Sequence, residues 1–535
     1  MVVDDQVEAG PLVEMQKVER RAADPLESAL PKAPARPIHE RAVSRADQKG
    51  HLTKASPQKG SVIIIGAGPA GLTAAHELQR GGSLLRPLVL EASEMVGGIS
   101  RTEAHQGNRF DIGGHRFFTK VPEVEAMWRE VLGDDLITVP RLSRIYYRGR
   151  YFAYPLKLLD ALSNIGLYEA FRIVVSYAKW QVRPHRKEET FEEWVINRFG
   201  GRLYMHFFRT YTQKVWGIPP DRIQADWAAQ RIKNLSLPKA VWNAISGAND
   251  TTSLIERFQY PRLGPGMMWE RTRDLIVARG GEVRLGAEVV RVNREGEVVT
   301  SVDVRHWTEE GKAELEERVK GDFFINSMAL RDLIEAFDPP APPEVREAAA
   351  KLRYRDFMIV TLQLDHPDPF PDNWIYIHSP TVRVGRIQNF RAWSRDMLAN
   401  PETASIGMEY FVNKGDELWS MSDAALREFA ADELEQLGLA RRDSVIGHSV
   451  IRQPKAYPVY DTEYRGALEV IAAWLGTLRN FQTVGRNGLH RYNNQDHSML
   501  SAMLAARNII GEAHDVWNVN VDRAYHEEFA TRRTA

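Results

Sequence analysis

The sequence predicts an α/β protein with an inserted helical domain and an antiparallel β-sheet domain, and three observations support this. The glycine-rich stretch "GAGPAGL" lies between a β-branched run and an Ala-rich run, the order of a strand, a turn and a helix. From about residue 155 to 247 the pattern is mainly helical. From about residue 352 to 460, short alternating runs such as "FMIVTLQL" and "IGMEYFV" predict antiparallel strands.

The bulk composition is that of an ordinary globular protein. The 535 residues are 43% hydrophobic and 26% charged, enough for a large core. Lys and Arg number 70 against 71 Asp and Glu, so the overall balance indicates no nucleic-acid or anionic-membrane partner. The chain has no cysteine, which excludes disulfides and thiolate chemistry and is consistent with a cytoplasmic protein. No secretory signal or spanning apolar run is found, so we expect no membrane span.

Seven segments are expected along the chain. The first has no aromatic residue and too little apolar surface to offset its ordering entropy, which is typical of a disordered tail. Three segments are expected to form one nucleotide-binding domain, and two to form substrate domains. In order they are the tail (1–60), the first nucleotide-binding segment (61–154), the helical substrate domain (155–250), the second nucleotide-binding segment (251–335), the antiparallel-sheet substrate domain (336–470), the C-terminal nucleotide-binding segment (471–515) and a C-terminal tail (516–535).

The first motif is a dinucleotide-binding turn of the Rossmann type. Gly66, Gly68 and Gly71 have the spacing G-x-G-x-x-G between strand and helix. The first glycine permits a tight turn, the second lets the backbone approach a pyrophosphate, and the third lets helix and strand pack closely. Glu91 closes the next predicted strand, where an acid accepts hydrogen bonds from a ribose.

The residues that follow favour FAD over NAD. "EMVGGISR", with Gly98 and Arg101, looks like the flavoprotein extension of the Rossmann signature, in which the arginine meets the FAD pyrophosphate. "FDIGGHRFF" brings a second glycine pair with Gly114 and His115, and Val289 is a further expected cofactor contact in the second nucleotide-binding segment. No separate NADPH domain is indicated, and no metal site is expected.

A strand, a glycine turn and a helix recur near the C-terminus in "VGRNGLHRYNNQDHSM". Backbone N–H groups at Gly485 are expected to face the flavin, as they do in two-segment FAD folds. The cofactor-binding set therefore includes residues from both ends of the chain.

These motifs resemble the FAD-dependent superfamily that contains amine oxidases, protoporphyrinogen oxidase and UDP-galactopyranose mutase, over about residue 62 to 508. "YTQKVWG" resembles the Y-T-x-K-x-W-G stretch of UDP-galactopyranose mutase, which is also followed by a proline-bearing turn and an arginine. In the mutase this tyrosine and tryptophan line the nucleotide-sugar site, and the arginine holds a substrate phosphate. The resemblance assigns these roles to Tyr211, Trp216 and Arg231.

Further matches to the mutase follow in order. "VRVGRIQNFRAWS" implies a second diphosphate arginine at Arg386, and "AYPVYD" a phosphate-binding hydroxyl at Tyr457. "GRNGLHRYNNQD" implies FAD contacts for Arg486 and Asp496 and a substrate-phosphate contact for Tyr492. "DIGGHRFF" is closest to the D-x-G-G-H of eukaryotic mutases, which places His115 beside the isoalloxazine. Arg116 stands where mutases commonly have an apolar residue.

The resemblance implies a mutase that interconverts pyranose and furanose forms of a nucleotide sugar without net redox change. Reduced FAD is then the active form, its N5 forming a sugar adduct, with NAD(P)H as a candidate external reductant. Arg231 and Arg386 would clamp the diphosphate, because a guanidinium donates two parallel hydrogen bonds and stays charged. The expected catalytic residues are His115, Arg231, Arg386, Tyr457 and Tyr492.

Two other functions stay open at this point. The shared fold is equally that of FAD-dependent oxidases acting on an amine, a porphyrinogen or an isoprenoid, although apolar substrates would leave an arginine-lined site unpaired. The third reading is a non-enzymatic FAD-stabilised scaffold. The sugar, the base and the oligomeric state are not given by the sequence.

Overall fold

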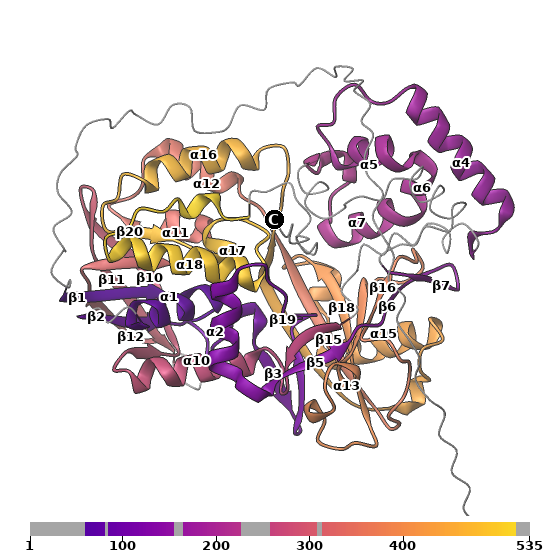
Figure 1. The fold of residues 1–535 in the computed structure, drawn as a ribbon, viewed down its shortest axis with the longest axis horizontal. Coiled ribbons are helices and arrows are strands. Elements are labelled where there is room, and N and C mark those ends of the chain that lie inside the picture. Colours follow the sequence, from indigo (N-terminus) through magenta and orange to yellow (C-terminus); the bar gives the residue numbers. More distant parts are fainter. Residues whose placement is uncertain (1–58, 81–83, 155–163, 226–256, 308–312, 521–535) are drawn as a thin grey trace, which may run out of the picture. The chain divides into compact units, whose positions relative to one another are not determined.

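A five-stranded parallel sheet carries the glycine motif. The computed structural model describes residues 59–80, 84–154, 164–225, 257–307 and 313–520. The strand order is β20-β13-β1-β2-β9, and all four neighbouring pairs are parallel (Figure 1). The strands are β1 (Lys59–Ile65), β2 (Leu84–Leu90), β9 (Glu282–Arg284), β13 (Phe323–Asn326) and β20 (Phe481–Thr483). Three separate stretches of the chain thus contribute to one Rossmann-type sheet, as the predicted fold class requires.

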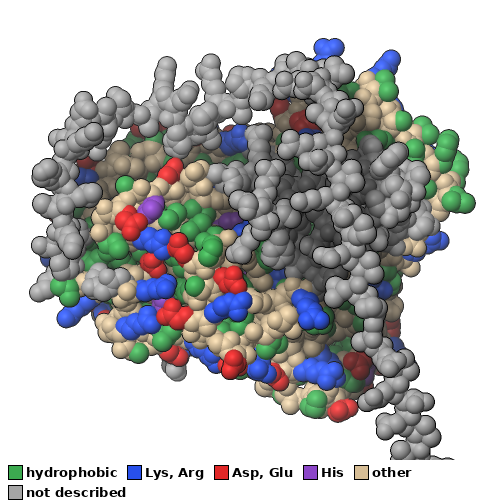
Figure 2. All heavy atoms as spheres, viewed as in Figure 1, with side chains coloured by type: hydrophobic (Ala, Val, Ile, Leu, Met, Phe, Trp, Pro, Cys, Tyr) green, Lys and Arg blue, Asp and Glu red, His purple; other side chains and the backbone are tan. Residues whose placement is uncertain are grey.

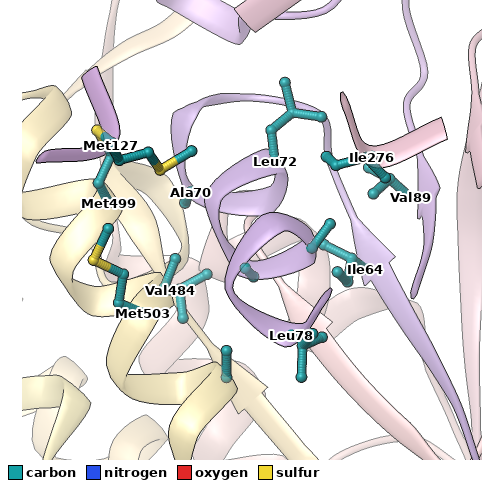
Figure 3. Packing of buried hydrophobic residues seen from close by; sticks show 14 of the residues in the cluster. Ile64, Ala70, Leu72, Leu78, Val89, Met127, Ile276, Val484, Met499 and Met503 are labelled. Atoms are coloured by element: carbon teal, nitrogen blue, oxygen red, sulfur yellow. The ribbon is translucent and has the colours of Figure 1, made fainter. Parts of the chain in front are cut away.

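Helices bury one face of this sheet. They are α1 (Pro69–Arg80), α2 (Pro122–Leu132), α10 (Gly266–Ala278) and α18 (Gln495–Ile509). The Ala-rich side of α1 packs against α18, because small side chains let the two helices approach closely. Figure 3 shows Ala70 and Leu72 of α1 with Met499 and Met503 of α18 and Val484 after β20, all buried. The N- and C-terminal parts of the nucleotide-binding region therefore share one core.

The other face of β1 joins a second core. A four-stranded sheet of order β12-β11-β10-β14 is packed with three further helices. Its strands are β10 (Ala287–Glu295), β11 (Val298–Trp307), β12 (Ala313–Lys320) and β14 (Phe337–Asp338), and the helices are α11 (Leu330–Ala336), α12 (Pro343–Lys351) and α16 (Tyr464–Leu475). Ile63 of β1, Val292 of β10 and Ile471 of α16 belong to one buried cluster. The consecutive apolar residues of β1 are therefore buried on both faces, as in parallel sheets generally.

A seven-stranded sheet forms the predicted antiparallel domain. Its order is β19-β15-β18-β17-β16-β6-β7, antiparallel throughout except for the parallel pair β6 and β16. Its strands are β6 (Ser143–Tyr147), β7 (Arg150–Ala153), β15 (Tyr354–Leu364), β16 (Trp374–Ile377), β17 (Arg386–Asn389), β18 (Ala404–Val412) and β19 (Val445–Pro458). Helix α15 (Asp423–Gln436) covers one face. Two strands of the predicted segment 61–154 thus extend a sheet that otherwise lies in 336–470.

The segment 155–250, predicted to be a helical domain, is mainly helical where the structure describes it. It contains α4 (Leu167–Val182), α5 (Phe191–Phe199), α6 (Gly201–Tyr204), a π-helical turn η3 (Met205–Arg209) and α7 (Thr210–Trp216). Helix α5 begins with a capping box, in which Thr190 and Glu193 bond each other's backbone N–H groups. A Cβ on Gly200 would lie 2.8 Å from the Tyr177 Cα, so α4 and the start of α6 touch backbone to backbone. Helix α7 ends at Gly217, which has a left-handed φ of +66°.

Smaller elements connect these layers. They are two two-stranded sheets, β3 (Thr102–His105) with β4 (Asn108–Asp111) and β5 (Leu136–Pro140) with β8 (Arg257–Pro261), and the short helices α13 (Phe390–Trp393), α14 (Glu417–Ser420) and α17 (Gly485–Gly488). Residues 55–535 make up one compact unit. The expected tails, 1–60 and 516–535, lie mostly outside the described residues. In the part of the chain that the structure describes, the helices are too short or too polar to cross a bilayer.

Candidate functional site

The turn after β1 uses its three glycines differently. Gly66 has a φ of +95°, a region that favours glycine. A Cβ on Gly71 would lie 1.8 Å from the Gly66 carbonyl oxygen, so the turn and α1 pack backbone to backbone. A Cβ on Gly68 would meet only the Gly98 Cα, at an ordinary contact distance of 3.8 Å. Gly66 and Gly71 therefore serve the protein's own packing, and Gly68 leaves room beside a helix N-terminus, where phosphates bind.

A second glycine turn faces the first. Gly97 and Gly98 have φ values of +104° and +55°, and a Cβ on Gly98 would lie 3.2 Å from the Gly68 Cα. Arg101 Nη1 donates to the Gly98 carbonyl oxygen (3.1 Å) and to Gln453 Oε1 (2.9 Å). Arg101, the residue predicted to contact the FAD pyrophosphate, therefore stabilises this second glycine turn through its own hydrogen bond.

Glu91 organises the first turn from the end of β2. Its Oε2 accepts from the Ala67 N–H (2.7 Å) and its Oε1 from the Ser93 N–H (3.0 Å). A carboxylate has about four acceptor positions, so it can still accept from ribose hydroxyls. The Glu91 carbonyl accepts from the Ala287 N–H (2.8 Å), which brings β10 alongside, and Val289 is buried on that strand.

The C-terminal turn completes the cradle. Gly485 has a φ of +83°, and a Cβ there would lie 2.9 Å from the Ala70 Cβ at the start of α1. Its N–H donates to Ser501 Oγ (3.0 Å), so this N–H is engaged within the protein and does not face the flavin as the sequence led us to expect. Asp496 is buried in the first turn of α18, where the helix dipole favours an acid. Glycine backbones from three parts of the chain therefore surround the N-terminus of α1, and this arrangement fits a dinucleotide.

The glycine pair before His115 lies against an arginine. Gly113 has a φ of +91°, and a Cβ there would lie 3.3 Å from Arg386 Nη2. Burial, together with the charges of Arg486 and Arg386, lowers the pKa of His115 to about 3. The imidazole is therefore neutral at physiological pH, and its buried Nδ1 makes no hydrogen bond within the described part of the chain.

Arg386 is held at one nitrogen by a fully buried carboxylate. Residues Arg386 and Glu409 face each other across β17 and β18, and Arg386 Nε donates to Glu409 Oε2 (2.7 Å). Glu409 also accepts from Gln388 Nε2 (2.7 Å) and from the Gly114 N–H. Although burial opposes the charge, Glu409 and the surrounding tyrosines hold the pKa of Arg386 well above its usual value. The described residues offer no hydrogen-bond partner to its two terminal nitrogens.

Two stacked tyrosines lie beside this arginine. The rings of Tyr457 and Tyr492 have centroids 5.5 Å apart and an interplanar angle of 15°. The Arg486 guanidinium carbon lies 5.6 Å from the first ring centroid and 5.0 Å from the second. Trp216, at the end of α7, contacts both rings at 6.5 Å and 6.0 Å. Burial and the neighbouring Tyr492 raise the pKa of Tyr457, so its hydroxyl stays protonated.

Helix α7 brings Tyr211 to the same place. The ring stacks on His378 (4.5 Å, 11°) and meets Tyr376 edge-on (5.7 Å). Burial raises its pKa well above the usual value, and the charge of Arg386 acts against this rise. The hydroxyl of Tyr211 is therefore a neutral group close to the guanidinium.

Lys214 fixes α7 to the seven-stranded sheet. Its ammonium donates to the carbonyl oxygens of Ser379 (2.6 Å), Val384 (3.1 Å) and Ile377 (3.3 Å). Burial lowers the pKa of this lysine to about 8. The lysine of "YTQKVWG" therefore acts as an anchor that sets the positions of the motif's tyrosine and tryptophan.

Most of the predicted site residues come together. Printed contacts or charge interactions link them into one group, which we call the arginine–tyrosine cluster: His115, Tyr211, Trp216, Arg386, Tyr457, Arg486 and Tyr492. Arg231 lies outside the described residues, so its predicted role in a two-arginine clamp stays a prediction. Among the residues that the structure describes, no group of metal-ligating side chains occurs.

Sequence reasoning missed Glu409, the partner of Arg386. A signal was present, because a single acidic residue interrupts the apolar strand "IGMEYFV", and buried acids are rare unless paired. The signal does not name the partner, since that depends on which strands are neighbours.

A second buried acid was also missed. Asp111, at the end of β4, accepts from Thr102 Oγ1 (2.8 Å) and from the Tyr260 hydroxyl. Burial raises the pKa of Asp111 to about 7. The same loop leads to the glycine pair before His115, so this network positions part of the site.

We expect Asp111 to make the protein less stable as pH rises from about 4 to about 7. A carboxyl with a higher pKa in the folded chain binds more protons there than in the unfolded chain, so the free energy of unfolding falls through this interval. A change from 3.8 to about 7 corresponds to at most about 4 kcal/mol. Denaturant unfolding at several pH values should show this slope in the wild type and not in Asp111→Asn.

Asp303 supplies the control. Arg318 lowers its pKa, so its contribution is lost only as pH falls below the ordinary value of 3.8. Asp303→Asn should therefore keep the wild-type slope above pH 4. Parallel curves for the wild type and Asp111→Asn would contradict the prediction.

Comparison with known proteins places this geometry in context. The family model described as flavin containing amine oxidoreductase matches residues 69–453. A protein of Mycobacterium tuberculosis provisionally named flavin-containing monoamine oxidase AofH is 29% identical over 303 residues, which cover 54% of this chain and 61% of that relative. The chain thus spans less than two thirds of this curated relative.

Solved structures share the fold. Reduced UDP-galactopyranose mutase superposes with a TM-score of 0.74 at 21% identity, covering 86% of this chain and 96% of the mutase. A protein of Exiguobacterium sp. 255-15, provisionally assigned as a protoporphyrinogen oxidase, superposes with a TM-score of 0.63 at 16% identity, covering 85% and 99%. At these identities the likeness concerns the fold, and it confirms the fold class and the resemblance that the motifs indicated.

Proposed function

Because the chain belongs to the flavin containing amine oxidoreductase family, we propose that it is a nucleotide-sugar mutase similar to UDP-galactopyranose mutase. The protein is a flavin enzyme and its cofactor is FAD. The proposed reaction interconverts pyranose and furanose forms of the sugar without net redox change.

The fork of Arg386 carries this proposal. Glu409 engages Nε (2.7 Å), and the terminal nitrogens have no partner among the described residues. A guanidinium held in this way can donate two parallel hydrogen bonds to a phosphate oxygen pair. Its position against Gly113 places that fork beside the segment that the resemblance assigns to the flavin.

The rest of the arginine–tyrosine cluster favours an anionic ligand. Arg486 lies over both stacked tyrosines, and the hydroxyl of Tyr457 is a neutral donor near Arg386. Glu409 offsets the charge of Arg386, whereas Arg486 donates to uncharged backbone carbonyls, so the remaining positive charge would repel a protonated amine in a partly dry site. The tyrosine rings, at 5.5 Å, already stack on each other and leave no space for an amine between them.

The same groups favour cleavage of the bond between the sugar and the diphosphate. As the anomeric C–O bond breaks, the leaving diphosphate gains negative charge, which Arg386 and the tyrosine hydroxyls stabilise more than the uncleaved ester. Bound FAD in its reduced form would supply the nucleophile for the anomeric carbon and would be released from it again when the diphosphate rejoins the sugar. Arg386 and the tyrosine hydroxyls would hold the free diphosphate in the site during this interval, so that no group is lost from the substrate.

His115 contributes as a neutral group. With a pKa of about 3 it does not add a third positive charge, and its unpartnered Nδ1 can hold a hydrogen bond to the ligand or the cofactor. We assign it a positioning role beside Arg386.

The test uses the FAD-loaded protein reduced with dithionite. We expect UDP-galactopyranose, or another UDP- or GDP-pyranose from a panel, to perturb the reduced-flavin spectrum and to yield a furanose product on chromatography. If no sugar nucleotide changes the spectrum or is converted, the mutase proposal is wrong.

An oxidoreductase is the second candidate, favoured by the name of the Mycobacterium relative. Such an enzyme would consume oxygen or another acceptor in proportion to an added amine, whereas a mutase turns over repeatedly with no acceptor. Oxygen uptake with a panel of amines therefore separates the two functions on the same preparation.

A further inference from the structure

Helix α4 is apolar on its solvent side. Leu167, Phe171 and Val182 are 89%, 67% and 80% exposed, and other large apolar residues between them are exposed as well. The full set of exposed apolar residues on α4 is Leu167, Tyr168, Phe171, Val174, Val175, Ala178 and Val182. Figure 2 shows hydrophobic side chains gathered along the edge where α4 lies in Figure 1. A patch of this kind marks an interaction site in a globular protein.

These residues form one continuous strip. At about 100° per residue, they occupy an arc of about 120°, with no polar residue inside it. The sequence spacing 167, 171, 174, 178 and 182 repeats every three or four residues. We call this strip the α4 apolar face.

The opposite side of α4 already makes the contacts that hold the helix in the fold. Ile173 is buried there, and Ser176 Oγ accepts from the Arg202 N–H (3.1 Å). Glu169 is paired with Arg202 and with His206 Nε2 (2.8 Å). The α4 apolar face is therefore not needed to attach the helix to the protein.

Basic residues border the apolar face on one side. Lys179, Arg172 and Arg183 follow it around the helix at about 120°, 140° and 160° from Leu167. All three are exposed. Further exposed basic residues are Arg186 beyond the helix and Arg148 and Arg150 at the tip of the hairpin β6–β7. Lys187 does not extend the row, because it is paired with the exposed Glu189 (3.5 Å).

We propose that α4 docks this protein onto an anionic lipid surface. An apolar strip bordered by a row of Lys and Arg is the pattern of a helix that lies flat in the lipid headgroup region. Each basic residue near such a surface strengthens binding by about fivefold. The near-zero net charge of the whole chain does not oppose this, because the attraction falls off within about 10 Å of the basic row.

Charge argues against a second copy as the occupant. The acidic residue of α4, Glu169, lies outside the apolar face and is already paired with Arg202 and, at 3.5 Å, with Arg172 of the basic row. A two-fold-related α4 would therefore bring a basic row toward the interface without an acidic row to meet it. An anionic surface complements the row directly.

Co-sedimentation of the full FAD-loaded chain with lipid vesicles tests the proposal. We expect stronger binding to phosphatidylcholine vesicles that contain phosphatidylglycerol than to phosphatidylcholine alone, and weaker binding as salt is raised. Phe171→Glu should lower the bound fraction by about tenfold or more, because it removes a ring that the lipid would bury and adds a negative charge that the anionic surface would repel. Val175→Glu, at a second exposed position on the face, should do the same.

Ile446→Glu is the matched control. Ile446 is 60% exposed on β19, outside the α4 apolar face, so its replacement should leave vesicle binding unchanged. Flavin absorbance and thermal unfolding should be the same for all variants, since each site is exposed. Failure of the wild type to bind anionic vesicles would overturn the proposal, as would equal binding by Phe171→Glu and Ile446→Glu. A dimer in light scattering that Phe171→Glu dissociates, with no vesicle binding, would assign the face to a second copy instead.

Discussion

Arg386→Lys is expected to lower sugar-nucleotide affinity by about 100-fold while the protein keeps its flavin. Lysine preserves the positive charge opposite Glu409, but its compact ammonium cannot pair with that carboxylate and also offer a planar fork. Loss of a bidentate, charge-assisted contact of this kind costs about 3 kcal/mol. Titration of the reduced protein with the nucleotide sugar, followed by flavin fluorescence, measures the affinity.

The conservative change is needed because of Glu409. Arg386→Ala would leave a fully buried carboxylate without its cation, which costs about 3–5 kcal/mol of stability and confuses folding with binding. The structure therefore predicts that the alanine variant is poorly folded. The double variant Arg386→Ala, Glu409→Gln should fold again, because the buried charge is gone, but should not regain affinity for the sugar nucleotide.

Arg144→Lys is a close control. Arg144, on β6 of the same sheet, is also paired with a fully buried carboxylate, through Nε and Nη2 to Asp372 at 2.8 Å and 2.5 Å. This substitution should lower stability and leave affinity unchanged. Loss of flavin from Arg386→Lys would mean that Arg386 belongs to the cofactor site, and unchanged affinity would remove it from the substrate site.

The features that the sequence predicted are those that depend only on residues close together in the chain. The turn at Gly66, Gly68 and Gly71 needs only neighbouring residues to form, so its spacing identified it. Strand and helix types were predictable for the same reason, because periodicity is a property of short windows. The matched motifs also predicted members of the arginine–tyrosine cluster, since each motif fixes the position of its own tyrosine or arginine.

The contacts that the sequence did not predict depend on which strands are neighbours and on the register in which they pair. Arg386 meets Glu409 because β17 and β18 are antiparallel neighbours with those two residues opposite each other. A shift by one residue would turn one side chain to the other face of the sheet. The pairing of β6 with β16 could not be predicted from the sequence either, because the two strands are parallel and more than 200 residues apart.

Helix α4 shows the same limit in another form. An apolar strip at helical spacing normally predicts the buried face. In the structure the opposite side, with Ile173 and Glu169, is the one that packs, because Arg202 and His206 of the neighbouring helices hold that glutamate. Partners distant in the sequence decided which face points outward.

Gly68→Ala is expected to give a folded protein that has lost most of its FAD. In the protein alone, the new Cβ would meet only the Gly98 Cα at 3.8 Å, an ordinary contact, so the apo-protein should unfold at nearly the wild-type temperature. The methyl group would occupy the space through which the backbone approaches the pyrophosphate. We expect an affinity loss of about 100-fold, or about 2.7 kcal/mol, measured by flavin absorbance after dialysis and by titration of the apo-protein.

Gly71→Ala, three residues from Gly68, should also lose FAD, but for a different reason: the substitution should destabilise the protein itself. Its Cβ would lie 1.8 Å from the Gly66 carbonyl oxygen, so the turn or α1 must move, and the apo-protein itself should lose about 3 kcal/mol of stability. Gly466→Ala in α16, where a Cβ meets nothing within 4 Å, controls for the substitution and should retain both stability and flavin.

If Gly68→Ala binds FAD as tightly as the wild type, the pyrophosphate does not lie against Gly68. If Gly68→Ala and Gly71→Ala destabilise the apo-protein equally, both glycines serve only internal packing.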